Sequence, residues 1–288
     1  MSSGTMMRRA YGKPAWRRNL AGYGLVAPIA VFLLLAFLLP LGFVFGLSIT
    51  EPTVSLGHFR RIVDVPAYLM VMWNTFRTAL TVTLTCLVLG YPIAYVVSRR
   101  SDAVAVVMLG IVAMSFWTSF LVRTYAWLVI LGNSGPVAAL YGTLGLGPMP
   151  KLLFTSFSST MGLVHILLPY MVLALYSVMK RIDPSHIRAA HSLGATPWVA
   201  FTNVYLPLSL PGIVSGSIVV FTVCLGFYVT PILLGGSSDM MISQLIHQQI
   251  DQLLNWGFAA ALSVVLLAAT ALIYSLYNHF FGLDTLWK

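Results

Sequence analysis

Residues 179–213 read MKRIDPSHIRAAHSLGATPWVAFTNVYLPLSLPGI and form a polar insert between two segments that are apolar enough to cross a bilayer. Asp183 followed by Pro184 is typical of a helix start, because the aspartate side chain caps the first turn and proline fits the first helical position. Gly194 can end this helix in the left-handed conformation. The pattern predicts a short, capped helix between Asp183 and Gly194.

The same start signal recurs at residues 196–197, and three aromatic residues then follow at helical spacing: Trp198, Phe201 and Tyr205. We expect this second helix to be stopped by the next prolines, Pro207 and Pro211. Two short helices joined by a glycine and held by membrane spans on both sides would make a rigid knob that faces water. The spacing alone is equally compatible with an amphipathic loop that lies on the membrane surface.

The composition excludes a water-soluble domain. The 288 residues are 59% hydrophobic and 8% charged, with a mean hydropathy of +0.89, so nothing would cover a soluble surface. The net charge of +9 would suggest nucleic acid in a soluble protein, but the distribution of the basic residues explains it better here. Cys86 and Cys224 lie in apolar segments, which argues against a disulfide framework. We also expect no cleavable signal peptide, since the first apolar run is too long.

The hydropathy pattern predicts an all-α membrane protein with six transmembrane helices, since each apolar segment is long enough to cross a core of about 30 Å. A polar tail (1–23) precedes one membrane domain (24–288), whose insert at 180–207 is a polar loop. A short surface helix is expected at 136–141 and an amphipathic helix at 238–254. The six expected spans are 25–49, 75–97, 104–131, 158–179, 211–234 and 258–281.

The positions of Lys and Arg predict the orientation. Eleven of them fall in the tail, the turn at 99–102, the insert and the C-terminus, whereas the loops on the opposite side hold Arg60, Arg61 and Lys151. By the positive-inside rule, both termini and the insert are expected in the cytoplasm. The tail contributes five of the eleven: Arg8, Arg9, Lys13, Arg17 and Arg18.

Two formal charges lie within the expected spans. Arg77 is expected near the outer start of the second span, where it can snorkel to the interface. Arg123 lies in an aromatic-rich string, at the outer interface if the third helix is continuous and near an outward-facing cavity if it breaks. The alternative for the aromatic residues is an interfacial belt.

The fifth expected span contains residues that favour a broken helix. Pro231 frees a backbone carbonyl, and Gly226 allows close helix approach, so this span can line a cavity or can simply contain a packing kink. Aromatic faces could attract a cationic cargo, although no acidic residue lies in any expected span. The candidate translocation residues are Trp117, Arg123, Tyr125, Tyr170, Phe227, Tyr228, Thr230 and Pro231.

No catalytic residues are expected. The six histidines have no metal-ligand spacing, and His165 is expected to be a packing or hydrogen-bonding residue. No arrangement of Ser, His and Asp suggests a triad, and no G-x-x-x-x-G-K-[ST] phosphate loop is present. The chain is therefore predicted not to hydrolyse ATP by that route and to hold no metal.

The insert resembles the cytoplasmic EAA loop of ABC importer permeases, through residues 188–190, 193–195 and 206–207. In that family the loop docks in a groove of the ATPase subunit as the coupling helix. Arg188 stands where the family has a glutamate, so a carboxylate contact at that position is not carried over. The resemblance assigns ATPase coupling to Pro184, Ile187, Arg188, Ala189, Ala190, Leu193, Gly194, Ala195, Leu206 and Pro207.

Spans three and five also resemble those of the spermidine/putrescine permeases, on residues 116–127 and 226–236. This implies a type I (MetI-like) permease fold in the bacterial cytoplasmic membrane, with a second permease of related fold, an ATPase dimer inside and a solute-binding protein outside. It further implies that ATP and Mg²⁺ belong to the ATPase and that this chain needs no cofactor. Nucleic acid is not expected as a partner.

The alternatives left open differ in class. Within the importer reading, the cargo can instead be an opine, thiamine, ferric iron or a phosphonate. A stand-alone secondary transporter would need buried ionisable residues or paired interrupted helices, which are not clear here. An integral membrane enzyme would need a catalytic constellation, which the sequence lacks.

Overall fold

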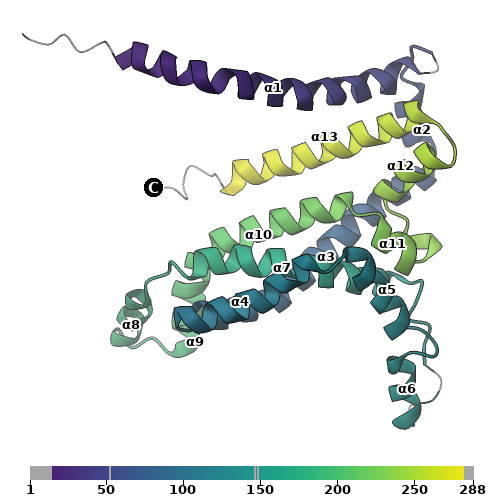
Figure 1. Cartoon of the computed structure of the whole chain (residues 1–288). Coiled ribbons are helices and arrows are strands. Elements are labelled where there is room, and N and C mark those ends of the chain that lie inside the picture. Colours follow the sequence, from purple (N-terminus) through teal and green to yellow (C-terminus); the bar gives the residue numbers. More distant parts are fainter. Residues whose placement is uncertain (1–14, 52, 146, 148, 282–288) are drawn as a thin grey trace, which may run out of the picture.

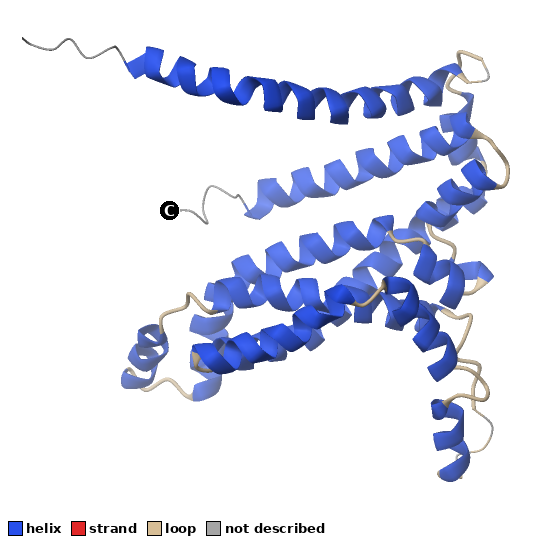
Figure 2. Ribbon diagram, in the orientation of Figure 1, coloured by secondary structure: helices blue, strands red, loops and turns tan. Residues whose placement is uncertain are grey.

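The computed structural model describes residues 15–51, 53–145, 147 and 149–281, and every regular element within them is a helix (Figure 2). The basic residues Arg8, Arg9 and Lys13 lie outside the described part of the chain, as does Lys288. Five helical segments are long and apolar enough to cross a membrane. They are found in α1 (Ala15–Thr50), α3 (Pro66–Ser98), α7 (Ser156–Met179), the helix that runs from Pro197 to Gly226, and α13 (Trp256–Phe281).

A sixth crossing is bent. Helices α4 (Asp102–Trp117) and α5 (Phe120–Ile130) pass the same test together but meet at an angle of 92°. The expected third span at 104–131 therefore exists as a broken helix, and the prediction of six spans is confirmed on that basis. The break falls at Thr118, which adopts extended backbone angles, and Ser119, whose ψ of 134° is also not helical.

Short helices connect the crossings. The expected surface helix appears as α6 (Pro136–Thr143), and the expected amphipathic helix as the shorter α12 (Ile242–Asp251). The second span begins at Pro66, earlier than the expected residue 75, and Arg77 lies exposed on its surface. The remaining elements are α2 (Gly57–Asp64), α8 (Pro184–Ser192), α9 (Pro197–Ala200), the π-helical turn η1 (Phe201–Tyr205), α10 (Leu206–Gly226), α11 (Val229–Leu234) and the 3₁₀ turn η2 (Ser237–Asp239).

The expected boundaries of the fifth span, 211–234, were wrong. The helix starts at Pro197 and continues through α9, η1 and α10, and α11 is a separate piece. Pro207 and Pro211 do not stop it. Each proline removes one backbone hydrogen bond, but a helix that ended at Pro211, where the apolar span begins, would leave several backbone groups without partners. Continuing the helix is therefore the less costly solution.

The core of the bundle forms where α3, α7 and α10 pack against one another (Figure 1). Met171 of α7 is fully buried at their centre. A Cβ atom added to Gly216 of α10 would lie 2.8 Å from its sulfur, and one added to Gly90 of α3 would lie 3.1 Å from its Cγ. Small residues thus let three apolar helices approach closely, as is usual inside membranes.

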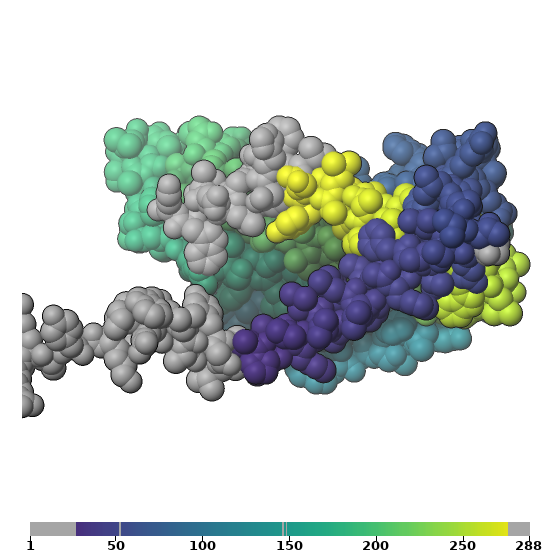
Figure 3. Space-filling view, turned by 90° about the horizontal axis from the view of Figure 1, so that it is seen from above, coloured from purple at the N-terminus to yellow at the C-terminus, as the bar shows by residue number. Residues whose placement is uncertain are grey.

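Helix α1 lies at the edge of the bundle and packs on α13 (Figures 1 and 3). Its apolar side chains remain exposed, for example Phe32, Phe37 and Phe43. A smaller core of α2, α12 and α13 is centred on Phe258, which is fully buried. The start of α1, the α8–α9 region and the end of α13 lie at one end of the molecule, and α2, α5, α6, α11 and α12 lie at the other (Figure 1).

Candidate coupling segment and translocation site

Helix α8 begins as the sequence predicts. One carboxylate oxygen of Asp183 accepts a hydrogen bond from the Ser185 backbone N–H at 2.7 Å, and Pro184 occupies the first turn. This hydrogen bond lowers the pKa of the Asp183 carboxyl below its ordinary value, since it stabilises the ionised form. The start of α8 is therefore fixed by interactions within three consecutive residues.

Helix α8 also ends as predicted. Gly194 has a φ of +87°, in the left-handed region. The Ala195 N–H donates to the Ala190 carbonyl at 3.0 Å and the Gly194 N–H donates to the His191 carbonyl at 3.0 Å. These two bonds form a Schellman motif, which satisfies the last carbonyls of the helix.

Helix α9 follows at once, with the Thr196 hydroxyl accepting a hydrogen bond from the Val199 N–H at 3.4 Å. We call residues 183–200 the capped segment. Its second half has no joint with the membrane helix that follows, because the chain continues helically through η1 into α10. The pair Leu206–Pro207 therefore lies inside this long helix, where a loop end was expected.

The predicted coupling residues divide by exposure. Leu193 is 89% exposed, and the aromatic residue Trp198, which lies close to it in the sequence, is 72% exposed. Ile187 packs against the main core, so α8 has an inner apolar face. Among the other predicted positions, Ala190, Ala195 and Leu206 are half-buried, and Pro184, Arg188, Ala189, Gly194 and Pro207 are exposed.

Polar contacts fasten this end of the bundle together. The Lys180 ammonium lies 2.7 Å from the Asp102 carboxylate and donates to the Arg100 carbonyl at 3.4 Å, which links the end of α7 to the α3–α4 turn. The Asp102 hydrogen bond raises the pKa of Lys180. Between α3 and α10, the Tyr91 and Ser209 hydroxyls are 2.9 Å apart.

At the other end of the molecule, the α4–α5 break is held by Arg123. Its Nη2 atom donates to the Thr118 carbonyl at 3.2 Å, which supplies a partner at the carboxyl end of α4. The other two guanidinium nitrogens, Nε and Nη1, are buried without a partner among the described residues. Of the two possibilities left open by the sequence for the third span, a continuous helix or a broken one, the structure adopts the broken helix.

Neighbouring helices supply hydrogen-bond partners at the α10–α11 break and at the end of α11. The Ser243 hydroxyl of α12 donates to the Phe227 carbonyl at 2.7 Å, and the Ser158 hydroxyl of α7 donates to the Leu234 carbonyl at 2.6 Å. Such backbone at membrane depth needs protein partners of this kind. A Cβ atom on Gly162 of α7 would lie 2.6 Å from Leu234 Cδ1 and 2.8 Å from Thr230 Cγ2, so α11 packs directly against α7.

The two breaks meet, and we call this region the junction. The Thr124 and Thr230 hydroxyl oxygens are buried and 3.1 Å apart. Phe120 packs edge to face on Phe227, with ring centroids 6.3 Å apart. The polar contact joins α5 to α11, and the aromatic contact joins α5 to the break at Phe227.

The structure brings together only part of the predicted translocation set. Phe227, Thr230 and Pro231 lie at the junction with Arg123. Tyr170 packs edge to face on Phe116, with ring centroids 4.9 Å apart. Trp117 is 85% exposed and Tyr125 56%, so both side chains face away from the packed interior. Tyr228 turns toward α12, where its ring lies 4.8 Å from that of His247.

Several junction residues were missed from the sequence. Phe116, Phe120 and Thr124 lie in the aromatic-rich string that drew attention to Arg123, but nothing in the spacing distinguishes them. Ser243 carries no sequence signal, because its role depends on a carbonyl freed elsewhere. His165 accepts a hydrogen bond from Trp127 Nε1 at 3.1 Å, which confirms the hydrogen-bonding role expected for it.

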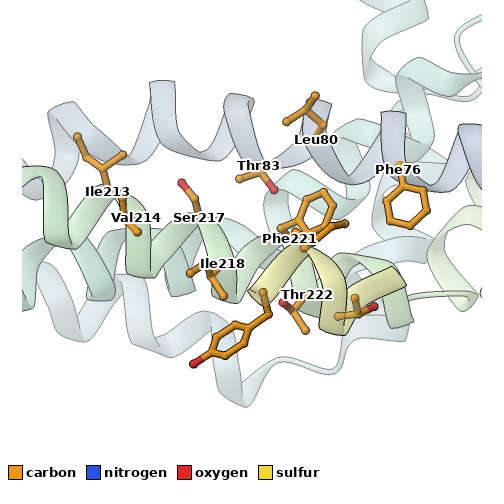
Figure 4. Close-up of a pocket in the computed structure, with 12 residues that line it drawn as sticks. Phe76, Leu80, Thr83, Ile213, Val214, Ser217, Ile218, Phe221 and Thr222 are labelled. Carbon is orange, nitrogen blue, oxygen red and sulfur yellow. The ribbon is translucent and has the colours of Figure 1, made fainter. Parts of the chain in front are cut away.

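A separate cavity of about 620 Å³ lies between α3, α10 and α13 (Figure 4). Phe76, Leu80, Ile213 and Phe221 line it, and its few polar groups are uncharged hydroxyls such as that of Ser217. None of the predicted translocation residues borders it. Its chemistry suits apolar chains and offers nothing to hold a cationic solute.

Comparison with known proteins places the chain in a family. Residues 87–281 match the family described as "Binding-protein-dependent transport system inner membrane component". The chain is 32% identical over 231 residues to the spermidine/putrescine transport system permease protein PotB of Escherichia coli strain K12, which covers 80% of this chain and 84% of that protein. It is 30% identical over 255 residues to the inner membrane ABC transporter permease protein YdcU of the same strain, with 84% and 80% covered.

Among solved structures, the bacterial alginate ABC transporter, in complex with an alginate pentasaccharide-bound periplasmic protein, contains a chain of the same fold. The TM-score is 0.71 at 18% identity, with 92% of this chain and 95% of that chain covered. The fold, the matched family and the similarity to named permeases agree. The chain belongs to the family of inner-membrane components of binding-protein-dependent transport systems, and it is a permease subunit of an ABC importer and not an enzyme.

Proposed function

We propose that this permease forms half of the translocation pathway for a polyamine such as spermidine or putrescine. A second permease of related fold completes the pathway, and a solute-binding protein delivers the cargo from outside. An ATPase dimer, which binds ATP and Mg²⁺, docks on the capped segment from the cytoplasm. This chain supplies the path and the mechanical connection and needs no cofactor of its own.

The observation that carries this proposal is the build of the capped segment. Both of its helices have a capped start and Gly194 closes the first, so the segment can transmit force without unfolding. It presents the apolar side chains of Leu193 and Trp198 to water, which a partner surface would cover. It is continuous with α10, and the end of α7 that precedes it is tied to the α3–α4 turn through Lys180.

The proposed orientation places the capped segment and both termini in the cytoplasm. The start of α1, the end of α13 and the capped segment share one end of the molecule (Figure 1). Most of the Lys and Arg residues in the described part of the chain belong to this end, and the positive-inside rule assigns such an end to the cytoplasm. A cytosolic ATPase can then reach the segment.

The cargo assignment rests on the names of the PotB relatives and on the aromatic rings at the junction. Aromatic faces attract cations, but Arg123 lies beside them, and no acidic side chain lies among the described residues of the junction. A polycation would therefore bind weakly to this subunit. We infer that cargo affinity resides in the solute-binding protein and that the junction acts as a path or gate.

The proposal is tested by reconstituting the assembled importer in liposomes with its binding protein. We expect ATP hydrolysis and uptake of labelled spermidine or putrescine to rise together when the loaded binding protein is added. The cargo assignment would be overturned if ATP hydrolysis rose when the binding protein carried an opine, thiamine, ferric iron or a phosphonate and did not rise when it carried a polyamine. The permease function would stand in that case. Purification of the active chain without any ATPase would overturn the coupling itself.

A further inference from the structure

A basic pocket lies where the membrane helices end beside α8. It has a volume of about 530 Å³, and it is bordered by the last residues of α3 and α7 and by the first turns of α8. Its size is within the range of sites that hold small molecules, about 300–1,000 Å³. The lining residues that matter here are Arg99, Arg100, Lys180, Ile187, Arg188 and Tyr205.

The pocket carries an excess of positive charge. Lys180 is paired with Asp102, but Arg99, Arg100 and Arg188 form no ion pair with the described residues, and no acidic residue is among those that line the pocket. Asp183 is within electrostatic range of Arg188, but its carboxylate is occupied in capping α8. An anion that entered the pocket would therefore meet three arginines, none of which is already paired with a carboxylate of the described residues.

Aromatic side chains hold one of these arginines in place. The Arg99 guanidinium carbon lies 4.3 Å from the ring centroid of Tyr95 and 5.0 Å from that of Tyr205. Such stacking orients a guanidinium without neutralising it, and its N–H groups remain able to bind phosphate oxygens. The pocket is thus partly preorganised for an anion.

The depth of the pocket favours a lipid over a soluble anion. Ser98 and Met179 end two apolar membrane helices, so the arginines lie at the level where lipid headgroups meet water. The same pocket has an apolar side, formed in part by the half-buried Ile182 and Ile187. A free phosphate would use the charges alone, whereas a phospholipid would use both sides of the pocket.

We propose that this pocket binds the headgroup of an anionic phospholipid from the leaflet next to α8. The phosphodiester contacts Arg99, Arg100 and Arg188, and the first methylenes of the acyl chains contact the apolar side. Basic pockets between membrane helices on this side of a membrane are typical sites for such headgroups. A lipid held there would bridge α3 and α8 and so stiffen the connection of the capped segment to the bundle. The bridging role and the assignment of the pocket to the cytoplasmic side rest on the proposed function, but the binding of an anionic headgroup does not.

The test uses the assembled importer in nanodiscs and needs no cargo or nucleotide. Nanodiscs of phosphatidylcholine are doped with labelled phosphatidylglycerol, and the lipid that is retained after transfer to detergent is counted by native mass spectrometry. Replacing three arginines as R99Q/R100Q/R188Q should weaken retention by on the order of a hundredfold, since each charge near the membrane surface contributes about fivefold. The matched control R60Q/R77Q/K151Q loses the same charge away from the pocket and should retain the lipid.

A charge-preserving variant guards against loss of folding. R99K/R100K/R188K should retain most of the phosphatidylglycerol. Equal retention by the glutamine variant and the control would overturn the proposal. Displacement of the lipid by inorganic phosphate at about 10 mM would show a general anion site and would also overturn it. The proposal would likewise fail if the glutamine variant kept its lipid but lost the co-purifying ATPase, because the pocket would then serve the protein partner. None of these results bears on cargo uptake.

Discussion

The capped segment and the junction are both irregular in a helical protein, but they are held in different ways. In the capped segment, the caps and the Schellman motif join residues that lie at most five positions apart, such as Ala195 and Ala190. At the junction, the bonds join Ser243 to Phe227, Ser158 to Leu234 and Thr124 to Thr230, which come from separate helices. One region is fixed by its own sequence and the other by its neighbours.

This difference fits the tasks proposed for the two regions. A segment that is fixed by local bonds keeps its shape when its surroundings move, so it can pass on a force. A junction that is fixed by contacts between helices changes when those helices shift, so it can open and close. Four substitutions test this comparison.

The largest expected effect comes from Gly194→Val. A β-branched residue at a φ of +87° is strained by about 1–3 kcal/mol or more, which would open the Schellman motif. We expect uptake and stimulated ATP hydrolysis to fall at least about tenfold while the complex still assembles. The matched control is Gly145→Val, because Gly145 has a φ of +64° and equally open surroundings but lies in the loop after α6. Transport at the wild-type rate in the Gly194 variant would refute the proposal that the segment transmits force.

Gly162→Leu tests whether the junction depends on packing. The new side chain would collide with Leu234 and Thr230 and push α11 away from α7. Overpacking of this kind costs about 1–3 kcal/mol, which thermal unfolding of the detergent-solubilised complex would report. Gly110→Leu in α4 is the control, since nothing lies within 4 Å of that position. Equal melting temperatures for the two variants would mean that α11 can move at little cost.

Ser243→Ala tests the interhelical cap at the junction. It leaves the Phe227 carbonyl without its partner from α12, which costs about 1–2 kcal/mol when that group is largely buried. The control Ser263→Ala removes a hydroxyl that bonds only within its own helix, to the Ala259 carbonyl. Hydrogen exchange in α11 should increase in the first variant and stay unchanged in the second. Equal exchange would show that water replaces the lost bond.

Asp183→Asn should have the smallest effect, visible only through pH. The pKa of Asp183 is lowered in the folded state, so the stability it contributes is present above its ordinary pKa and is lost as the pH falls through the folded value. Asparagine is also a good helix cap. Wild type and variant should therefore show the same hydrogen exchange in α8 at neutral pH, and the wild type alone should lose protection in acid. A difference at neutral pH would mean that the charge has a further partner.

The comparison also explains what the sequence could predict. Asp183, Gly194 and Thr196 were predicted correctly because caps depend on neighbouring residues. The end at Pro207 and Pro211 was wrong because the rule for proline assumes that water can take over the freed backbone groups, and an apolar layer does not allow this.

At the junction, the excessive length of the third span was visible in the sequence, but the position of its break was not. Thr118 and Ser119 are neither glycine nor proline, and the bend is held by Arg123 and by the contact of Phe120 with Phe227. Trp117 and Tyr125 share the aromatic string but point elsewhere, which composition cannot reveal. Residues that act through partners distant in sequence need the fold before they can be identified.

The unbroken helix from Pro197 to Gly226 has a mechanical consequence. Its 30 residues span about 45 Å, so Trp198 and the Phe227 break are the two ends of a single rod. A tilt of about 10° around its midpoint would carry each end through about 4 Å in opposite directions. A movement of the capped segment would then displace the junction directly, in the opposite direction, with no other element in between. Gly212 and Gly216 pack against α7 near the middle of this helix, so the helix would pivot at that contact. The stiffness of the contact would set how much of the movement of the capped segment reaches the junction.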